Sequence, residues 1–542
     1  MATIIKQFLS RTSASEDKDI RRLHPAREDE HERIPIFTLF FVYWQFAVVQ
    51  LVIMIREWFL RAFLRDQLDN PRERPDGYAP LFSDFDSYWT RNYYGRIKDC
   101  FNRPICSAPG GFVDLLERDM EGGALNRSLE FTGERQRCMN LSSYNYLGFA
   151  ENHGQCTEAV VSSVHSYGVS PCSALVSLGY TDVHRRFERQ VARYLGREAS
   201  IVFGMGYATN STCIASLVGP DGLLISDKLN HASLVVGCRC AGAHIRVFQH
   251  NNLDHLEHVL RKAIVEGHPR TRRPWSKIII LVEGIYSMEG EIIDLPAFVA
   301  IKKKYKAYLY LDEAHSIGAL GPTGRGVCEL TGVDPRDVDV LMGTFTKSFG
   351  SAGGYICGDQ ELIDYLRITS FSSLYDTAIP VGTVAQASTA MHVISGDDGT
   401  DEGRRRLQAL SRNTRYFRSR LTELGYRIAG ADDSPVVPMM FYHSGKMPLF
   451  SRMALELGLA VVVVSYPATQ LLLCRVRFCM TSGHTIEQLE EAVAKIHHIG
   501  QILSMQYNKP LTETWRNYLL PRGLYPPPIG KKLGWVFESF SQ

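Results

Sequence analysis

The chain has 542 residues, a formal net charge of +2 and 45% hydrophobic residues, which is the composition of an ordinary globular protein with two or three domains. This near-neutral balance argues against a nucleic-acid partner bound by phosphate neutralisation. The twelve cysteines are scattered without a C-x-x-C pair, so they indicate free thiols in a reducing compartment and neither a disulfide framework nor a metal site.

The amino-terminal region contains one long apolar segment. Residues 1–33 are polar and charged, and they lack the basic start and small-residue cleavage site of a signal peptide. Residues 34–56 are almost entirely apolar or aromatic and are long enough to cross a bilayer, so we predict a membrane helix there. Gln45 and Gln50 are costly in hydrocarbon, which makes a buried or interfacial helix the alternative. Arginines on both sides leave the orientation open.

The central part of the chain predicts a large α/β domain. Residues 57–140 form a turn-rich linker and an aromatic amino-terminal segment. From 141 to 400, short apolar runs alternate with amphipathic stretches, which predicts a mostly parallel sheet with helices on both faces. A ligand site then belongs at the carboxyl ends of the strands. The expected strands are 199–203, 223–226, 245–248, 278–282, 307–311 and 338–342, and helices are expected at 253–265 and 296–304.

The pattern changes after residue 400. A long helix is expected at 404–424, before strands at 436–441, 459–464 and 475–481. Residues 401–507 therefore predict a smaller α+β domain, and residues 508–542, which include three consecutive prolines, look like an extended tail.

One lysine lies in an unusual place for a cation. Lys347 follows the strand expected at 338–342, between small hydroxyl residues and before a glycine-rich turn. Burial of an ammonium group costs several kcal/mol unless it is paired or neutralised, and it lowers the lysine pKa. Such a lysine is suited to forming a Schiff base with an aldehyde cofactor. The alternative is a lysine at a strand end with its amine in solvent.

A second motif closes the strand at 307–311. Asp312 at a buried strand end is costly unless it meets a cation, and the pyridinium nitrogen of an aldehyde cofactor is such a cation. His315, three residues later, could hydrogen-bond the phenolic oxygen of the cofactor. The alternative is a helix N-cap at Asp312 or Ser316.

Three further motifs suit the same kind of site. Residues 203–210 run from a strand into two glycines and a probable helix, which could present backbone N–H groups to a phosphate. His231 follows a strand and could stack on a flat ring, or it could have only a structural role. Arg475 and Arg477 lie on one face of a strand, where a buried arginine could clamp a carboxylate. The alternative there is a surface strand with at least one solvated arginine.

The order of these motifs resembles that of the α-oxoamine synthases, which are pyridoxal phosphate enzymes with the aspartate aminotransferase fold (fold type I). Residues 283–290, 318–326 and 343–350 carry the resemblance most strongly, and it extends from about residue 82 into the small domain. It implies a PLP-dependent transferase fold of type I, with the smaller carboxyl-terminal α+β domain and the amino-terminal membrane helix.

The resemblance also implies roles for single residues. Lys347 would anchor the cofactor, Asp312 would pair with its pyridine nitrogen, His315 would bond its phenolic oxygen and His231 would stack on its ring. Four other residues would surround the cofactor and its phosphate: Gly206, Tyr207, Thr344 and Thr346. Arg477, and not Arg475, would hold the amino-acid carboxylate, and Thr377 would reach a phosphate across a dimer interface. Tyr144 stands where relatives with other substrates have asparagine, which is compatible with the serine-using branch.

The implied reaction is a PLP-dependent decarboxylative condensation of L-serine with palmitoyl-CoA, which gives 3-ketosphinganine, CoA and CO2 as the first step of sphingolipid biosynthesis. The implied partners are a related subunit without the lysine, in a heterodimer, and small regulatory membrane subunits. The implied location is the endoplasmic reticulum membrane, with the catalytic body facing the cytosol. A different amino-acid substrate, such as glycine or alanine, and a non-catalytic scaffold subunit are the alternatives. Leu175 stands where relatives commonly have an arginine, which leaves open how ligands are held on that side.

Overall fold

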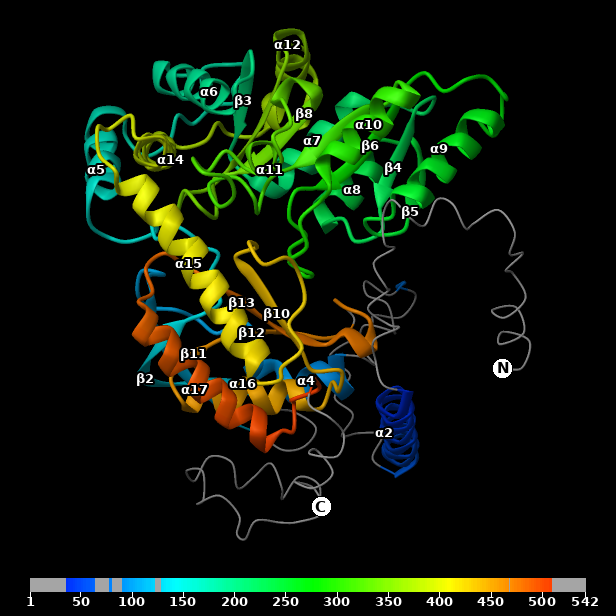
Figure 1. Cartoon of the computed structure of the whole chain (residues 1–542), viewed down its shortest axis with the longest axis vertical. Helices are drawn as coiled ribbons and strands as arrows, with labels where there is room; N and C mark the ends of the chain where they lie inside the picture. Colours follow the sequence, from blue (N-terminus) through cyan, green and yellow to red (C-terminus); the bar gives the residue numbers. More distant parts are fainter. Residues whose placement is uncertain (1–35, 64–77, 80–89, 122–127, 467, 509–542) are drawn as a thin grey trace.

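The computed structural model describes residues 36–63, 78–79, 90–121, 128–466 and 468–508. The predictions for the polar segment at 1–33 and for the tail from 509 onward lie outside these residues. Figure 1 shows a large domain built on one sheet and a smaller domain beside it, with the first helix against the smaller domain.

The first helix, α2 (Ile36–Phe63), confirms the helix expected in the apolar segment and extends it at its carboxyl end. Within it, Leu39–Phe59 is long and apolar enough to cross a membrane, by length and composition. One face packs on the small domain, where Val42 contacts a cluster that contains Met440 and Tyr442. Most large side chains of the other face are exposed, Trp44 among them.

The polar residues of α2 have partners in the protein. Gln45 lies 3.2 Å from His443, and Gln50 donates a hydrogen bond to the hydroxyl of Tyr93. Each of the two glutamines that are costly in hydrocarbon therefore has one protein partner for its amide, although Gln45 remains exposed.

The large domain is built on a seven-stranded mixed sheet in the order β3-β9-β8-β7-β6-β4-β5. Six of the strands are parallel to one another and confirm the six expected runs; these are β3 (Ala199–Phe203), β4 (Leu223–Asp227), β5 (His244–Phe248), β6 (Ile278–Glu283), β7 (Tyr308–Asp312) and β8 (Val340–Thr344). The sequence did not predict β9 (Gly354–Gly358), which pairs antiparallel with β3 and β8. Its two terminal glycines are more typical of a turn than of a strand.

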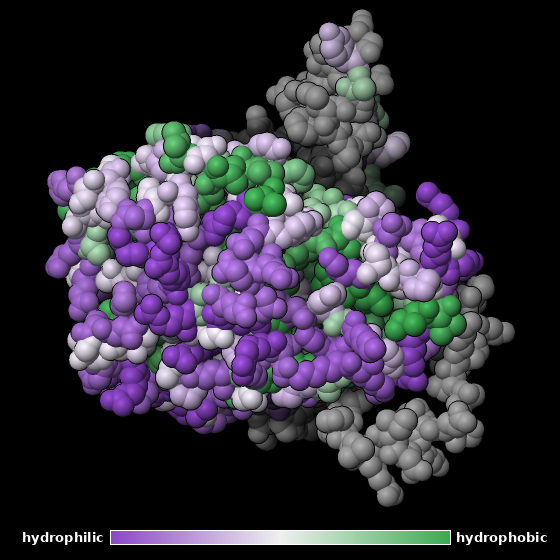
Figure 2. Space-filling model, turned by 90° about the horizontal axis from the view of Figure 1, so that it is seen from above, coloured by the Kyte–Doolittle hydropathy of each residue, from purple (hydrophilic) through white to green (hydrophobic). Residues whose placement is uncertain are grey.

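Alternate residues of the strands pack into two hydrophobic cores, one on each face of the sheet. Ile201, Leu281 and Tyr310 belong to one core, and Val202 and Leu311 belong to the other. The helices of this domain are α5 (Gln155–Tyr167), α6 (Asp182–Leu195), α7 (Gly206–Leu217), α8 (Ala232–Cys240), α9 (Leu253–Glu266), α10 (Leu295–Tyr305), α11 (Val327–Thr331), α12 (Gln360–Thr369), α13 (Phe371–Tyr375) and α14 (Val381–Ser395). Figure 2, which looks down on this domain, shows hydrophobic patches within a mainly hydrophilic surface.

The small domain contains two three-stranded sheets. The antiparallel order β10-β13-β12 joins β10 (Val436–Met440), β13 (Arg475–Cys479) and β12 (Val462–Val464). The order β1-β2-β11 joins β1 (Phe112–Glu121), β2 (Ser128–Asn140) and β11 (Leu459–Ala460). The helices are α15 (Glu402–Glu423), α16 (Lys446–Glu456) and α17 (Ile486–Ile502), and short helical turns include α4 (Gly95–Ile97).

The prediction of a single strand at 459–464 is wrong. The chain forms β11 and then β12, which belong to different sheets, with Val461 between them. An apolar run of six residues does not reveal that its two halves hydrogen-bond to different neighbours. All twelve cysteines are free, as expected.

Candidate active site

Four strands end at the same edge of the large sheet and bring the predicted motifs together. The parallel strands β6 and β7 place Glu283 opposite Asp312 in register, and β7 continues the pairing with Met342 of β8. Lys347 follows β8, and His231 follows β4. Because parallel strands share the direction of their carboxyl ends, motifs more than 100 residues apart meet there.

Lys347 is partly buried, and its amine lies 5.5 Å from the ring centre of Tyr144. Burial lowers its pKa to about 8, although the charges of Asp312 and Glu283 act in the opposite direction. The alternative of an amine in open solvent is therefore wrong.

Asp312 is a buried carboxylate, with 4% of its surface exposed. Its oxygens accept hydrogen bonds from the side-chain amide of Asn210 at 2.7 Å and from the backbone N–H of Ala314 at 2.8 Å. Residues 313–326 are described and contain no helix, since α11 begins only at Val327, so the N-cap alternative is wrong. The charge of Asp312 is held by hydrogen-bond donors at the sheet edge, where a ligand cation could meet it.

His315 is buried behind the same edge. Its Nδ1 lies 2.8 Å from the hydroxyl of Tyr146, and its ring is nearly perpendicular to that of Tyr144 at 5.0 Å. Burial, together with the charges of Lys347 and Arg477, holds the pKa of His315 well below its ordinary value. This histidine is therefore a neutral hydrogen-bonding group at physiological pH. The sequence did not single out Tyr146, which precedes the first strand of the large sheet and has no local signal of its role.

His231 combines a structural contact with an open ring. It is the N-cap of α8, and its side chain accepts a hydrogen bond from the backbone N–H of Ser233. Its ring is exposed and lies edge-on to the ring of Tyr207, with 5.9 Å between centres. The structural role considered for His231 is present, and it leaves the ring accessible to a ligand.

Gly206 begins α7 in very close contact with Thr344. A Cβ atom at Gly206 would lie only 2.6 Å from the Thr344 hydroxyl oxygen. That hydroxyl donates to the carbonyl of Gly353 at 2.8 Å and lies 2.9 Å from the hydroxyl of Thr346. The first N–H groups of α7 and two threonines are thus gathered beside Tyr207, in an arrangement that suits a phosphate.

Thr377 is exposed and lies near the turn that precedes α7. Its backbone bridges to Ala174, and its carbonyl oxygen would lie 3.7 Å from a Cβ at Gly204, in the turn that precedes α7.

Leu175 is 5% exposed and packs in the core cluster that contains Ile201 and Phe203. The residue that stands where relatives commonly have an arginine is therefore a packing residue in this chain.

The two arginines of β13 are both buried, with 1% of Arg475 and 7% of Arg477 exposed, so the alternative of a solvated arginine is wrong. Arg475 donates to the carbonyl of Met288 at 2.8 Å and lies 3.5 Å from a carboxylate oxygen of Glu289. The guanidinium of Arg477 lies 4.7 Å from the ring centre of Tyr144. Its Nε has no hydrogen-bond partner among the described residues, which leaves a buried donor for a ligand.

A cavity of about 560 Å³ opens beside Lys347. Its wall includes Tyr144, Asn145, Thr346 and Gln386. The amide of Gln386 donates to the carbonyl of Phe149 at 2.9 Å, which fixes that side of the wall. The sequence did not indicate Asn145 or Gln386, because neither follows a strand of the large sheet. Of the predicted site residues, Tyr144, Thr346 and Lys347 line this cavity, whereas Asp312, His231 and Arg477 lie outside its lining.

Residues 136–496 match the aminotransferase class I and II family, and the mixed seven-stranded sheet with an aspartate and a lysine near adjacent strand ends is consistent with that class. The chain is 49% identical over 436 residues to serine palmitoyltransferase 2 of Dictyostelium discoideum, over 80% of this chain and 89% of that protein. It is 46% identical over 484 residues to serine palmitoyltransferase 3 of Homo sapiens, over 89% of this chain and 87% of that protein. The chain therefore belongs to the serine palmitoyltransferase family, in the branch of the subunit 2 type.

A solved structure supports the same assignment. The serine palmitoyltransferase of S. paucimobilis, solved with a bound PLP–myriocin aldimine, is 25% identical, with a TM-score of 0.68 over 79% of this chain and 100% of that chain. The predicted fold class is confirmed.

Proposed function

We propose that this chain condenses L-serine with palmitoyl-CoA and releases 3-ketosphinganine, CoA and CO2, in the first step of sphingolipid biosynthesis. The observation that carries the proposal is the site around Tyr144, where an amine with a lowered pKa and a buried guanidinium with an unpartnered Nε lie near one ring. This arrangement provides a base next to a carboxylate-binding group.

The residues present fit pyridoxal 5′-phosphate. The close approach of Gly206 to Thr344 leaves backbone donors free of a side chain, which suits the phosphate. Asp312 provides a buried negative charge for a pyridinium nitrogen, and Lys347 provides an amine that is partly neutral near pH 8. Tyr207 and Thr346 are assigned to the surroundings of the cofactor and His231 to the face of its ring, while Thr377 is assigned to a phosphate contact across a dimer interface.

When bound, pyridoxal 5′-phosphate supplies an electron sink that stabilises a carbanion at the α-carbon of the amino acid. Arg477 holds the carboxylate of serine through Nε and a terminal nitrogen, and it orients the α-carbon toward Lys347. The neutral Nζ of Lys347 removes the α-proton and carries it as an ammonium proton. The carboxylate of Asp312 would lie at the ring nitrogen, where its negative charge would offset the positive charge of that nitrogen.

The two neutral histidines have different roles, one toward the cofactor and one toward the acyl-CoA. His315, fixed by Tyr146, bonds the phenolic oxygen of the cofactor without adding a further cation next to Lys347 and Arg477. His231 is exposed at the mouth of the site and is placed to polarise the thioester carbonyl of the acyl-CoA.

The partner proposed for this chain is serine palmitoyltransferase subunit 1, a related subunit without the lysine, in a heterodimer that also binds small regulatory membrane subunits. Support comes from large exposed hydrophobic side chains on two helices, α5 and α13, of which α13 ends two residues before Thr377. They are Val161, Val164, Tyr167, Phe371 and Tyr375. Exposed apolar surface of this kind is typical of a protein interface.

The proposed location is the endoplasmic reticulum membrane, with the catalytic body on the cytosolic side. The exposed apolar face of α2 supports membrane contact, and a long-chain substrate resides in membranes. Replacing Phe40, Trp44 and Leu51 by serine removes apolar surface without touching the packed face, and it is expected to release the protein from sedimented membranes at high salt. Retention of the triple variant in the membrane fraction would contradict this role for α2.

The function is tested with the full-length chain purified with its partner. We expect CO2 release that depends on L-serine and palmitoyl-CoA, with little turnover of glycine or alanine, and loss of activity in Lys347→Ala. Full activity of Lys347→Ala would identify the chain as a scaffold for an active partner. Equal turnover with glycine would indicate a different amino-acid substrate.

A further inference from the structure

A run of buried polar side chains connects the two residues that flank the proposed cofactor ring. The hydroxyl of Tyr310 lies 2.8 Å from the Asn210 amide oxygen, and the Asn210 amide nitrogen lies 2.7 Å from Asp312 and 2.9 Å from the hydroxyl of Ser233. That hydroxyl lies 2.8 Å from Nδ1 of His231. All of these residues except His231 are at least 96% buried, so water does not complete their hydrogen bonds.

The charge of Asp312 sets the direction of every bond in this run. An ionised carboxylate only accepts hydrogen bonds, so the amide nitrogen of Asn210 must face Asp312. The amide oxygen of Asn210 then faces Tyr310, whose hydroxyl donates to it. The second hydrogen of the same amide nitrogen goes to Ser233, which makes the hydroxyl oxygen of Ser233 an acceptor.

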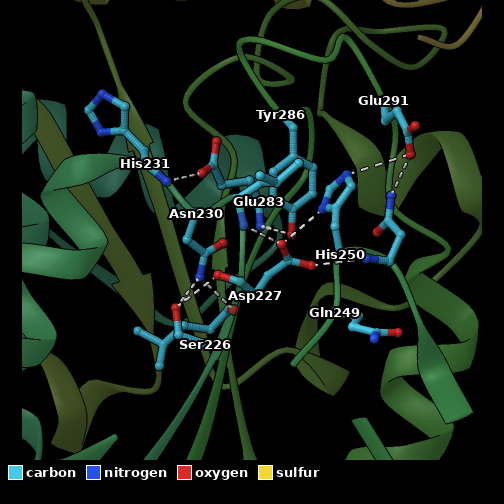
Figure 3. A network of polar contacts seen from close by, with 12 residues as sticks. Ser226, Asp227, Asn230, His231, Gln249, His250, Glu283, Tyr286 and Glu291 are labelled. Atoms are coloured by element: carbon cyan, nitrogen blue, oxygen red, sulfur yellow. Dashed lines mark hydrogen bonds and ion pairs between the residues drawn. The ribbon is translucent and has the colours of Figure 1, made fainter. Parts of the chain in front are cut away.

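The hydroxyl of Ser233 consequently has its own proton left to donate, and Nδ1 of His231 is the group within reach. The backbone N–H of Ser233 donates to the same Nδ1 at 3.2 Å. A nitrogen that accepts two hydrogen bonds carries no proton, so the proton of the neutral His231 ring lies on Nε2. Figure 3 shows the rest of the holding arrangement: the backbone N–H of His231 donates to Glu283, and its ring points away from the polar cluster behind it.

We propose that Asn210 and Ser233 are positioning residues that fix His231 as a neutral Nε2–H donor and orient the Asp312 carboxylate through the same amide. The use of that donor on an acyl-CoA carbonyl rests on the proposed function, whereas the hydrogen-bond run does not. Its physical benefit is electrostatic: two donors at Nδ1 oppose ring protonation, so His231 adds no cation near Lys347. A single amide therefore connects the carboxylate of Asp312 to the neutral ring of His231 through Ser233.

The test measures the protonation of His231 without substrate. The full-length protein, freed of cofactor, is treated with diethyl pyrocarbonate over a pH series, and modification of His231 is quantified by peptide mass spectrometry. Because the reagent acylates only neutral imidazole, the midpoint of the profile reports protonation. Loss of one donor to Nδ1 in Ser233→Ala is expected to raise the midpoint by about 0.5 to 1 pH unit.

Two further variants distinguish the proposed positioning role of Asn210 and Ser233 from a general structural effect. Ser233→Thr keeps the hydroxyl and is expected to keep the wild-type midpoint, while Asn210→Ala frees the Ser233 hydroxyl to turn away and is expected to raise it. The exposed His165 serves as an internal reference and is expected to keep one profile in all variants. If Asn210→Ala does not fold, the two Ser233 variants decide the question.

An unchanged midpoint in Ser233→Ala, or an equal rise of the midpoint in Ser233→Thr, would overturn the proposal that Ser233 positions His231. Either result leaves serine condensation untouched, because no substrate or turnover enters the measurement. Conversely, the expected rise of the His231 midpoint in a protein without condensing activity would refute the proposed function. The positioning role of Asn210 and Ser233 would still stand.

Discussion

The guanidinium of Arg477 lies over the ring of Tyr144, with 4.7 Å between its central carbon and the ring centre. The amine of Lys347 lies 5.5 Å from the same centre. Each cation interacts favourably with the π-electrons of the ring, and the positive charge of Arg477 also contributes to the lowered pKa of Lys347. Tyr144 therefore lies against both the proposed carboxylate-binding group and the proposed base.

The first prediction concerns Arg477→Lys. A lysine keeps the charge but cannot bind a carboxylate through two N–H groups, so we expect kcat/KM for L-serine to fall about 30- to 100-fold, or about 2–3 kcal/mol. The KM for palmitoyl-CoA is expected to change little. Steady-state kinetics with each substrate varied in turn provide the measurement. An unchanged KM for serine would show that the carboxylate binds elsewhere.

The second prediction concerns the pH dependence of cofactor loading. The neutral amine of Lys347 is the reactive form, and burial lowers its pKa from 10.5 to about 8. The rate at which cofactor-free protein gains visible absorbance with pyridoxal 5′-phosphate is therefore expected to rise as pH increases through about 8 and then to level off. Lys347→Ala is the control without absorbance. A rate that is still rising steeply near pH 10 would mean that this lysine titrates as an exposed one.

The third prediction compares two glycines of the turn that leads into α7. Alanine at Gly206 places a Cβ 2.6 Å from the hydroxyl oxygen of Thr344, whereas the nearest atom to a Cβ at Gly204 is 3.7 Å away. Gly206→Ala is expected to weaken cofactor affinity at least tenfold, with a steric cost of about 1–3 kcal/mol, while Gly204→Ala serves as the matched control. Equilibrium titration with pyridoxal 5′-phosphate measures both. Equal affinities in the two variants would show that the close contact between Gly206 and Thr344 is not needed for cofactor binding.

The fourth prediction concerns a buried ion cluster behind the site, visible in Figure 3. Nδ1 of His250 lies 2.8 Å from the buried Asp227, and its Nε2 lies 3.6 Å from Glu291. Burial lowers the pKa of His250, but its hydrogen bond to Asp227 and the negative charges of Asp227 and Glu291 outweigh burial and raise the pKa to about 10. Because the folded pKa lies above the unfolded value, the stabilisation is complete below pH 6.5 and is lost as pH rises toward 10.

The variant His250→Gln tests this cluster. Its loss of unfolding free energy is expected to be about 3 kcal/mol near pH 6 and to shrink toward zero near pH 10. Urea denaturation of variant and wild type at both pH values gives the difference, and His258→Gln on the exposed face of α9 is the control. A deficit that stays constant with pH would mean that His250 stabilises the fold by packing alone.

The order of the site residues could be predicted from the sequence because the fold converts order into position. In a parallel sheet each strand ends at the same edge, so Asp312 at the end of β7 and Lys347 shortly after β8 are brought to the same edge. The glycine turn before α7 and the histidine after β4 follow the same rule. Local patterns of apolar runs were sufficient for six strands and failed for β9, whose identity depends on hydrogen bonds to β3 and β8.

The remaining parts of the site depend on contacts that have no local pattern. Tyr146 precedes the large sheet and meets His315, 169 residues later, and the Tyr144 ring meets Arg477 from the small domain. The sequence could not separate the two arginines of β13 by burial, since both are buried and differ only in their partners.

The sequence by itself determined the fold class, the order of the motifs and the chemistry of each group, because strand-helix alternation and residue type are local properties. Only the tertiary structure decided how each group is tuned. The pKa of Lys347, the neutral state of His315 and the orientation of the Asn210 amide arise from desolvation and from partners distant in sequence. Desolvation and hydrogen-bond direction depend on the whole surrounding volume, which is defined only after the chain has packed.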